Sequence, residues 1–232
     1  GKGTYKGTDG AFYEGDWKGD KREGKGIHKY SNGDSFEGCW KEGKIEGKGT
    51  YKCANGDIFE GEWKDGKMEG KGTKKLANGD IFEGDWKGGR MEGKGTHKDT
   101  DGVFYEGDWK GGMMEGKGVC RHTSGWSYEG DWKDGIPDGK GVEKRASGAS
   151  YEGDWKEGKV EGKGVYKYAD GGYYVGGFKN SLAIGDGAQY AGDGTIRYQG
   201  GWRNNELHGD CDISHKLGSN KTAYREGWLQ HY

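Results

Sequence analysis

Residues 82–96 read Phe-Glu-Gly-Asp-Trp-Lys-Gly-Gly-Arg-Met-Glu-Gly-Lys-Gly-Thr, and close copies of this stretch fill most of the chain. An aromatic residue followed by Glu-Gly occurs seven times at intervals of 23 residues, and a tryptophan follows each aromatic residue four positions later. Gly-Lys-Gly recurs with the same period. The sequence therefore predicts a repeat array, in which each repeat is one small supersecondary structure that packs on its neighbours.

The amino-acid composition is unlike that of an ordinary globular domain. The 232 residues include 53 glycines and one proline, and only 29% of them are hydrophobic while 33% are charged. Such values alone would place the chain among disordered proteins. However, 10 Trp, 15 Tyr and 6 Phe supply large apolar areas without aliphatic side chains. We expect these rings to provide the apolar material of the fold, and we do not expect a compact two-layer domain.

Within each repeat, side chains alternate in the way that is typical of β-strands. Tyr13, Gly15 and Trp17 fall on one face of residues 13–17, and the charged residues fall on the other. Residues 24–30 alternate in the same way, and no helical period occurs in the sequence. We predict an all-β fold: an elongated single-layer antiparallel meander of repeated β-hairpins, with about nine to ten repeats of 23 residues.

The repeat is regular over residues 1–172 and degenerate over residues 173–232. In the second region Tyr174-Val175-Gly176 replaces the aromatic-Glu-Gly motif, and the later copies at Tyr198 and Tyr224 follow at steps of 24 and 26 residues. We expect the longer connections to interrupt the meander there. The second region is predicted to cap the array and to form a dimer interface, because a linear array otherwise ends in unpaired strand edges.

The turn residues predict a strand register. Asn32-Gly33-Asp34 tolerates positive φ and marks a hairpin loop. If the loop consists of these three residues, Gly26 lies opposite Trp40. If the other loop of the repeat has an even number of residues, Gly47 lies opposite Trp40 on the far side. Each tryptophan would then cover two glycines on neighbouring strands.

Charged residues balance along the chain, with 37 Lys and Arg against 39 Asp and Glu. No block of basic residues indicates binding to nucleic acid. On the charged face the predicted register sets Asp85 opposite Lys94. The recurring Glu14, Glu37 and Glu60 are spread along a surface instead of converging in a pocket, so we expect no catalytic residues.

Several features bear on localisation. Cys39, Cys53, Cys120 and Cys211 show no disulfide-framework spacing, which favours free thiols in a reducing compartment. No apolar run is long enough for a membrane span, so a cytoplasmic location is expected. Because the sequence begins at Gly1 without methionine and inside a Gly-Lys-Gly motif, we expect it to be a piece of a longer protein.

The repeat resembles the MORN repeat (membrane occupation and recognition nexus), and it does so most closely at residues 59–73 and 82–96. The resemblance covers almost the whole chain. The array, without an appended catalytic domain, is similar to MORN-repeat proteins of apicomplexan and kinetoplastid protists, which scaffold basal or cytoskeletal structures during cell division. The resemblance implies a non-catalytic scaffold that is associated with the cytoskeleton or lies at the inner face of a membrane.

The aromatic face is the predicted binding groove for protein or peptide partners, because so long an apolar stripe would not remain wholly exposed. Covering glycine backbone is the alternative use of the same rings. The predicted groove residues are Tyr13, Trp17, Phe36, Trp40, Phe59, Trp63, Phe82, Trp86, Tyr105, Trp109, Tyr128, Trp132, Tyr151 and Trp155. A variable position in each repeat would tune the groove. It is held by Tyr5, His28, Tyr51, Lys74, His97, Cys120, Glu143 and Tyr166.

The C-terminal repeats concentrate apolar residues, and we predict homodimerisation through them, with a simple cap as the alternative. The resemblance points the same way, since MORN arrays of this kind pair tail to tail. The predicted interface consists of Tyr173, Tyr174, Phe178, Leu182, Ile184, Tyr190, Ile196, Tyr198, Trp202 and Leu207.

Peripheral binding to anionic phospholipid is the alternative function. The family name and the lysines of the Gly-Lys-Gly motifs, which run from Lys25 to Lys163 in one register, suggest it. Glu and Asp alternate among these lysines, however, so the face lacks the excess positive charge that attracts anionic lipid.

A possible structural zinc site lies near the C-terminus. His208, Cys211 and His215 supply imidazole and thiolate groups within eight residues, and a fourth ligand could come from a dimer mate. The alternative is that His208 is a surface substitution, because the cluster lacks the paired Cys-x2-Cys spacing of most zinc sites. No other cofactor is predicted.

Overall fold

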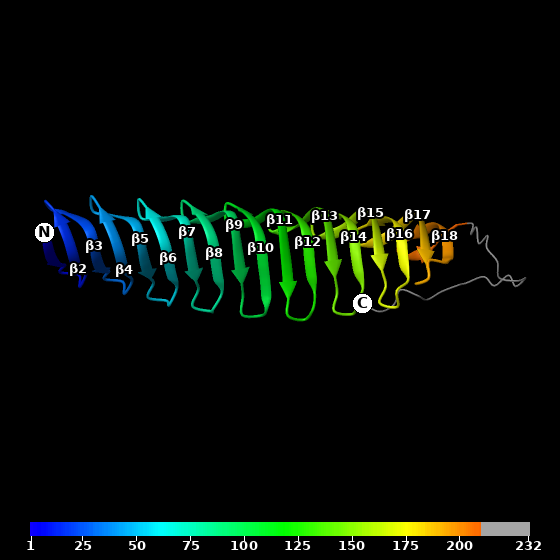
Figure 1. The fold of residues 1–232 in the computed structure, drawn as a ribbon, viewed down its shortest axis with the longest axis horizontal. Coiled ribbons are helices and arrows are strands. Elements are labelled where there is room, and N and C mark those ends of the chain that lie inside the picture. The colour runs from blue at the N-terminus through cyan, green and yellow to red at the C-terminus, as the bar shows by residue number, and fades with distance from the viewer. Residues whose placement is uncertain (210–232) are drawn as a thin grey trace, which may run out of the picture. The chain divides into compact units, whose positions relative to one another are not determined.

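The computed structural model describes residues 1–209, and every regular element in that part of the chain is a β-strand (Figure 1). The predicted all-β class is therefore confirmed. No helix that could cross a membrane is present among these residues. The chain divides into two compact units, an N-terminal unit of residues 1–122 and a C-terminal unit that begins at residue 123.

The strand bounds follow the repeat. The N-terminal unit contains β1 (Lys2–Lys6), β2 (Phe12–Lys18), β3 (Lys21–Lys29), β4 (Ser35–Lys41), β5 (Lys44–Lys52), β6 (Ile58–Lys64), β7 (Lys67–Lys75), β8 (Ile81–Lys87), β9 (Arg90–Lys98), β10 (Val103–Lys110) and β11 (Met113–His122). The described part of the C-terminal unit contains β12 (Ser127–Lys133), β13 (Ile136–Lys144), β14 (Ser150–Lys156), β15 (Lys159–Lys167), β16 (Tyr173–Lys179), β17 (Leu182–Tyr190), β18 (Ile196–Arg203) and β19 (Glu206–Leu207).

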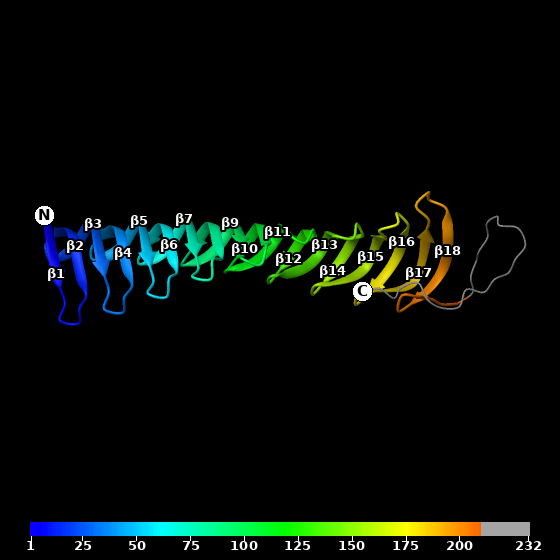
Figure 2. The ribbon, with the colours of Figure 1, turned by 90° about the horizontal axis from the view of Figure 1, so that it is seen from below.

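Within each unit the strands form a single-layer meander, in which each strand pairs antiparallel with the next one along the chain. Successive strands lie side by side, and the turns gather along two rims (Figures 1 and 2). One rim carries two-residue turns such as Glu42-Gly43, both at positive φ, of 50° and 84°. The other rim carries three-residue loops such as residues 31–33. The loop within the repeat thus has an even number of residues, which the register argument took as a condition.

The predicted register is wrong by two residues on both sides of Trp40. Tyr30 N–H donates to the carbonyl oxygen of Asp34 at 2.9 Å, so the three-residue loop spans residues 31–33 and not 32–34. In consequence Trp40 lies opposite Gly24 instead of Gly26. On its other side Trp40 lies opposite Ile45 instead of Gly47, because a β-bulge between Gly38 and Trp40 shifts the pairing.

One glycine from every complete strand lies in a single row on the side of the sheet that carries the aromatic residues. Gly15, Gly26, Gly38 and Gly49 pair in succession across β2 to β5. The Tyr13 ring covers Gly15 and Gly26, and a Cβ atom on Gly26 would overlap the Tyr13 hydroxyl group. Rings do cover glycine backbone as the sequence predicts, but the main cover is the tyrosine or phenylalanine and not the tryptophan.

The bulge is held by the residues around it. Tyr13 Oη donates to the carbonyl oxygen of Asp16 at 3.1 Å, and Asp16 Oδ2 accepts from the backbone N–H of Lys25 at 3.1 Å. The same pair of bonds recurs around Asp108, Asp131 and Asp154. The repeated aspartate therefore satisfies a backbone donor that the bulge would leave unpaired.

The tryptophans link neighbouring repeats. The indole N–H of Trp63 donates to the carbonyl oxygen of Gly49 at 3.0 Å, and Trp86 bonds to Gly72 in the same way at 2.8 Å. Most of these tryptophans also meet aromatic rings edge to face, as Trp40 does with Tyr13, at a centroid distance of 5.4 Å and an interplanar angle of 86°. These contacts make each repeat dependent on the repeat before it.

Ion pairs on the other face join a strand to the preceding one. Asp85 pairs with Lys71 at 2.7 Å, and Asp108 pairs with Lys94 at 2.5 Å. The prediction that Asp85 lies opposite Lys94 is wrong, because Asp85 falls in the β-bulge between Gly84 and Trp86, where the pairing with β9 shifts by two residues. These exposed pairs contribute little, about 0.2–1 kcal/mol each.

The meander continues beyond residue 172. β15 to β18 pair in order, and Tyr174 and Phe178 occupy the core positions that Tyr151 and Trp155 hold one repeat earlier. The expectation that longer connections interrupt the meander is wrong over residues 173–207. The role of this region as a cap stays a prediction.

Candidate partner-binding face

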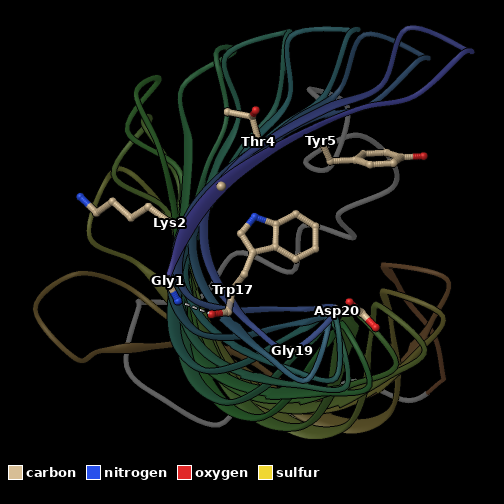
Figure 3. Close-up of a pocket in the computed structure, with 8 residues that line it drawn as sticks. Gly1, Lys2, Thr4, Tyr5, Trp17, Gly19 and Asp20 are labelled. Atoms are coloured by element: carbon tan, nitrogen blue, oxygen red, sulfur yellow. Dashed lines mark hydrogen bonds between the residues drawn. The ribbon is translucent and has the colours of Figure 1, made fainter.

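The sheet of the N-terminal unit is curved, and its two faces differ. In the view of Figure 3, Trp17 and Tyr5 point into the hollow of the curve, while Lys2 and Thr4 point away from it. We call the side that carries the aromatic residues the inner face and the opposite side the outer face. A solvent-open hollow of about 490 Å³ lies at β1, and Tyr5, Trp17 and Asp20 are among its lining residues.

All predicted groove residues lie on the inner face. Alternation along each strand places the tyrosines and phenylalanines there, and the tryptophans, which follow the bulge, pack beside these rings or the glycine row. Their exposure is less than the sequence suggested. Eleven of the fourteen are buried by their neighbours: Tyr13, Phe36, Trp40, Trp63, Trp86, Tyr105, Trp109, Tyr128, Trp132, Tyr151 and Trp155. These rings form the core of the repeats, and only Trp17, Phe59 and Phe82 are half-buried.

Phe59 and Phe82 are accessible for a specific reason. In their repeats the methyl groups of Met68 and Met91 lie over the glycine row, in the place that Tyr13 or Phe36 fills elsewhere. Both methionine side chains are buried, with 3% exposure. The two phenylalanine rings are therefore not needed as cover for glycine and remain half-open on the inner face.

The variable positions lie in the same row as the core aromatic residues. His28 pairs with Tyr13 on one side and with Phe36 on the other, and Tyr51 pairs with Phe36 and Phe59. Most variable side chains are half-buried, so one edge of each reaches solvent. The chemistry of the row changes from repeat to repeat while the rings beside it stay the same.

In the middle of the N-terminal unit two variable residues pack on the open rings. Lys74 Nζ lies 5.2 Å from the centroid of the Phe59 ring. The His97 ring stacks on Phe82 with a centroid distance of 4.2 Å and an interplanar angle of 9°. Both contacts lie on the part of the inner face where the rings are accessible.

A cluster around Arg22 was not predicted from the sequence. Arg22 Nη1 lies 2.9 Å from His28 Nδ1, and the guanidinium carbon lies 4.8 Å from the centroid of Trp40 and 5.2 Å from that of Tyr13. Since a guanidinium group can only donate, Nδ1 accepts and the imidazole is neutral. Burial, and then the positive charge of Arg22, lower the pKa of His28.

The carboxylate near this cluster is already engaged. Asp34 accepts hydrogen bonds from Tyr51 Oη at 2.7 Å, from the backbone N–H of Ala54 at 2.8 Å and from the Asn32 amide at 2.9 Å. These bonds, the one from Ala54 first, lower the pKa of Asp34. The residue thus stays ionised and fixes the loop at its rim.

The C-terminal unit has a cluster of different character on its inner face. Glu143 accepts from Trp126 Nε1 at 2.8 Å and from Arg145, whose Nη2 lies 3.1 Å from Glu143 Oε2. The Arg145 guanidinium also lies 5.7 Å from the ring centroid of Tyr166. The acidic variable residue of this unit is therefore neutralised within the chain.

The predicted dimer residues fall into three groups. Tyr174, Phe178, Tyr198 and Trp202 are core residues and are buried. Tyr173, Ile184 and Tyr190 are half-buried, while Leu182, Ile196 and Leu207 are exposed. The four core residues continue the repeat, so their burial within one chain accounts for their apolar character.

The outer face carries an apolar patch that the sequence argument only partly identified. Val175 pairs with Val165 and with Ala188, and it is 40% exposed. The rings of Tyr173 and Tyr190 stack at 4.5 Å beside it. We call these five residues the outer patch. Comparison of the repeats reveals it, because Val175 stands where earlier repeats have glutamate and Tyr190 stands where they have lysine or arginine.

Recurring acidic residues on the short-turn rim have structural partners. Glu23 Oε2 accepts from the backbone N–H of Glu42 at 3.0 Å, and Glu46 accepts from that of Asp65 at 3.1 Å. Each carboxylate thus fixes the turn of the following repeat. These contacts give a structural reason why acidic residues recur at fixed positions.

Of the predicted zinc ligands only His208 lies among the described residues, where it is exposed. Cys211 and His215 lie outside them, so the zinc site stays a prediction. Within residues 1–209, no group of three His, Cys, Asp or Glu residues could hold a metal ion. Cys39, Cys53 and Cys120 carry free thiols.

Comparison with known proteins identifies the repeat. The MORN repeat profile matches residues 13–35, 36–58, 59–81, 82–103, 105–127, 128–150, 151–173 and 198–209. No curated protein matches the sequence of the chain.

Among solved structures, the chain is similar to the SAS-4 (dCPAP) TCP domain of Drosophila melanogaster, in complex with a proline-rich motif of Ana2 (dSTIL). The two share 14% identity with a TM-score of 0.43, over 66% of this chain and 84% of that one. It is also similar to the CPAP G-box domain, with 13% identity and a TM-score of 0.46, over 85% of this chain and 97% of that one. Similarities at this level carry no inference about function.

The His28 cluster makes stability depend on pH. The pKa of His28 is lowered in the folded chain, so the unfolded chain binds its proton more readily once the pH falls below about 6.5. Stability from this residue is therefore complete above that pH and is lost as the pH falls. The variant His28→Tyr takes the residue that Tyr51 holds at the same position of the next repeat. Its free energy of unfolding, measured with urea, should fall less between pH 7 and pH 5 than that of the wild type. An exposed control, His208→Tyr, should keep the wild-type profile; identical profiles for all three proteins would contradict the assignment.

Proposed function

We propose that this chain, which belongs to the MORN-repeat family, is a scaffold that binds protein partners on its inner face and homodimerises through its C-terminal repeats. A MORN-repeat array is a repeat scaffold in which the same supersecondary structure is used many times. The family resemblance adds a cytoskeletal or cell-division structure as the place where the scaffold acts. Catalysis has no part in the proposal.

The observation that carries the proposal is that two sets of residues on the inner face have different roles. The glycine row and the buried rings repeat because the fold needs them, whereas the variable row differs in nearly every repeat. A row that served only packing would repeat as its neighbours do. Most side chains of the variable row are half-exposed, and together they offer a different contact in each repeat to an extended or helical segment of a partner.

Homodimerisation is supported by the outer patch. Each earlier repeat has a charged residue at the positions of Val175 and Tyr190, and charges on a free surface keep repeat proteins soluble. Their replacement by apolar residues in the C-terminal repeats is what a self-complementary interface requires. Leu182, Ile196 and Leu207 are exposed in the same repeats, but Leu207 lies opposite Trp202, in the inner-face position that Arg22 holds opposite Trp17, so it does not extend the outer patch.

Binding of anionic phospholipid is the second candidate, and a different set of lysines favours it. Lys29, Lys52 and Lys75 are exposed on the outer face, and their cross-strand neighbours include Ser35 and Ile58 instead of acids. The lysines of Gly-Lys-Gly, in contrast, are partly neutralised, as Lys71 is by Asp85. A row of unpaired lysines contributes about 1 kcal/mol per residue at an anionic surface.

Inner-face binding is tested by placing a photo-crosslinking phenylalanine analogue at Tyr51, on the inner face, or at the neighbouring Thr50, on the outer face. We expect adducts with partner proteins in cells from position 51 and none from position 50. The two positions are adjacent on β5, so expression and folding are matched. Equal adduct formation at both, or adducts from position 50 alone, would contradict inner-face binding.

Dimerisation is tested by restoring the charges of the earlier repeats with Val175→Glu and Tyr190→Lys. Because both side chains return to what the same positions carry in β14 and β15, the chain should still fold, and its mass by light scattering should fall from dimer to monomer. Phe178→Trp, a restoration within the core, is the control that should leave the dimer unchanged. A double variant that stays dimeric, or a wild type that is monomeric, would contradict the proposal.

Lipid binding is tested by sedimentation with two kinds of vesicle, one of phosphatidylcholine alone and one that also contains about 30% phosphatidylserine. If the lysine row binds lipid, the chain should sediment only with the anionic vesicles, and Lys29→Glu, Lys52→Glu and Lys75→Glu together should abolish sedimentation. Failure to sediment with anionic vesicles at low salt removes this second candidate and leaves the first intact.

A further inference from the structure

One repeat carries an arginine at a position that the other repeats fill with an apolar side chain. Arg22 lies opposite Trp17, and the residues in the same place opposite the next three tryptophans are Ile45, Met68 and Met91. Those three are 7%, 3% and 3% exposed. Arg22 is half-buried, so a permanent positive charge has entered the aromatic core with part of its surface still open on the inner face.

The charge of Arg22 is not neutralised by the chain. Its contacts are the hydrogen bond to His28 and the faces of the Tyr13 and Trp40 rings. None of the carboxylates within residues 1–209 forms an ion pair with it. A guanidinium has five N–H donors. Since Arg22 contacts one neutral acceptor and two ring faces, most of these donors are available to another partner.

A second cation lies further along this inner face, while Asp20 is the carboxylate at the hollow beside β1. Lys74, four strands further along, contacts the Phe59 ring and has no ion pair with a described residue. The nearby carboxylate, Asp34, is used by Tyr51 and by backbone N–H groups. The C-terminal unit differs, because there Glu143 and Arg145 neutralise each other. The N-terminal unit thus presents unpaired cations beside half-open aromatic rings.

We propose that Arg22 binds a carboxylate of an acidic, extended partner segment that lies across the inner face of the N-terminal unit. This inference rests on the inner-face binding proposed above and specifies the chemistry of the partner there. The neutral Nδ1 of His28 and the two rings hold the guanidinium plane, so that the free N–H groups can engage a carboxylate in the bidentate manner.

Lys74 sets a second contact. Strands β3 and β7 are four strand spacings apart, about 19 Å. An extended segment that crosses the strands spans this distance with about six residues, at about 3.3 Å each. A partner with two acidic residues spaced about six apart, and an apolar residue between them for the half-open Phe59 ring, fits the arrangement of charges and rings.

The test uses a phage-displayed library of random twelve-residue peptides, panned on the wild-type chain and on Arg22→Met. Methionine holds the same position at Met114, opposite Trp109, in a repeat where Tyr105 covers the glycine row as Tyr13 does here. The variant should therefore keep the core, which thermal unfolding checks. Wild-type selections should be enriched in Asp or Glu at one fixed position, and selections on Arg22→Met should lose this enrichment. The best peptide, made synthetically, should bind Arg22→Met at least tenfold more weakly, because a hydrogen-bonded pair of opposite charges is lost.

A double-mutant cycle makes the assignment specific. Replacing the selected acid by its amide in the peptide should weaken binding to the wild type by the same factor and should leave binding to Arg22→Met unchanged. Arg22→Lys should recover part of the affinity, because it restores charge without the planar donor group.

The outcomes separate this inference from the proposed function. Peptides that lack a fixed acid and bind Arg22→Met equally well, but lose binding to Tyr51→Glu, would overturn the role of Arg22 and leave inner-face binding intact. Because Tyr51→Glu removes the hydrogen bond from Tyr51 Oη to Asp34, thermal unfolding checks that this variant is folded. Peptides whose binding is unaffected by both substitutions, or the absence of any selected peptide, would overturn both.

Discussion

The structure depends on how a single-layer sheet can bury one of its faces without a second layer. The row of glycines that includes Gly15, Gly26 and Gly38 removes every side chain from one line across the strands, and the rings of Tyr13 and Phe36 lie in the space that this creates. Edge-to-face contacts with the tryptophans extend the cover from one repeat to the next. Each such pair adds about 0.5–1.5 kcal/mol beyond the area buried. A larger residue in the glycine row would displace the ring that covers it.

The polar residues of the repeat follow from the same arrangement. The bulge that positions each tryptophan leaves backbone groups without strand partners, and Asp16 and Tyr13 satisfy them. Glu23 and its equivalents fix the turns of the following repeat. Most recurring residues are thereby committed to the fold. Function in such a protein is expected at positions that the fold leaves free to vary, and this is why the variable row and the departures from the repeat carry the functional argument.

The two most informative departures from the repeat each change where charge is placed. Arg22 brings a charge into a core position, and Val175 removes one from a surface position. The first creates an inner face with unpaired positive charge in the N-terminal unit, and the second creates an apolar area on the outer face of the C-terminal unit. Neither change is needed by the repeat, because the neighbouring repeats fold with the ordinary residue in each place.

The sequence by itself determined the strands, the hairpin order and the face on which each side chain lies, because a period of two and a repeat of 23 residues are local properties. Val175 and Arg22 can also be found in an alignment of the repeats once their positions are known to matter. Only the tertiary structure decided the register around Trp40, because a bulge and a one-residue shift of the loop depend on hydrogen bonds between strands. It also decided that most groove rings are buried while Phe59 and Phe82 stay accessible. The reason is physical: exposure is set by the curvature of the sheet and by whether a ring or a methionine covers the glycine row, and neither is encoded in the alternation of side chains.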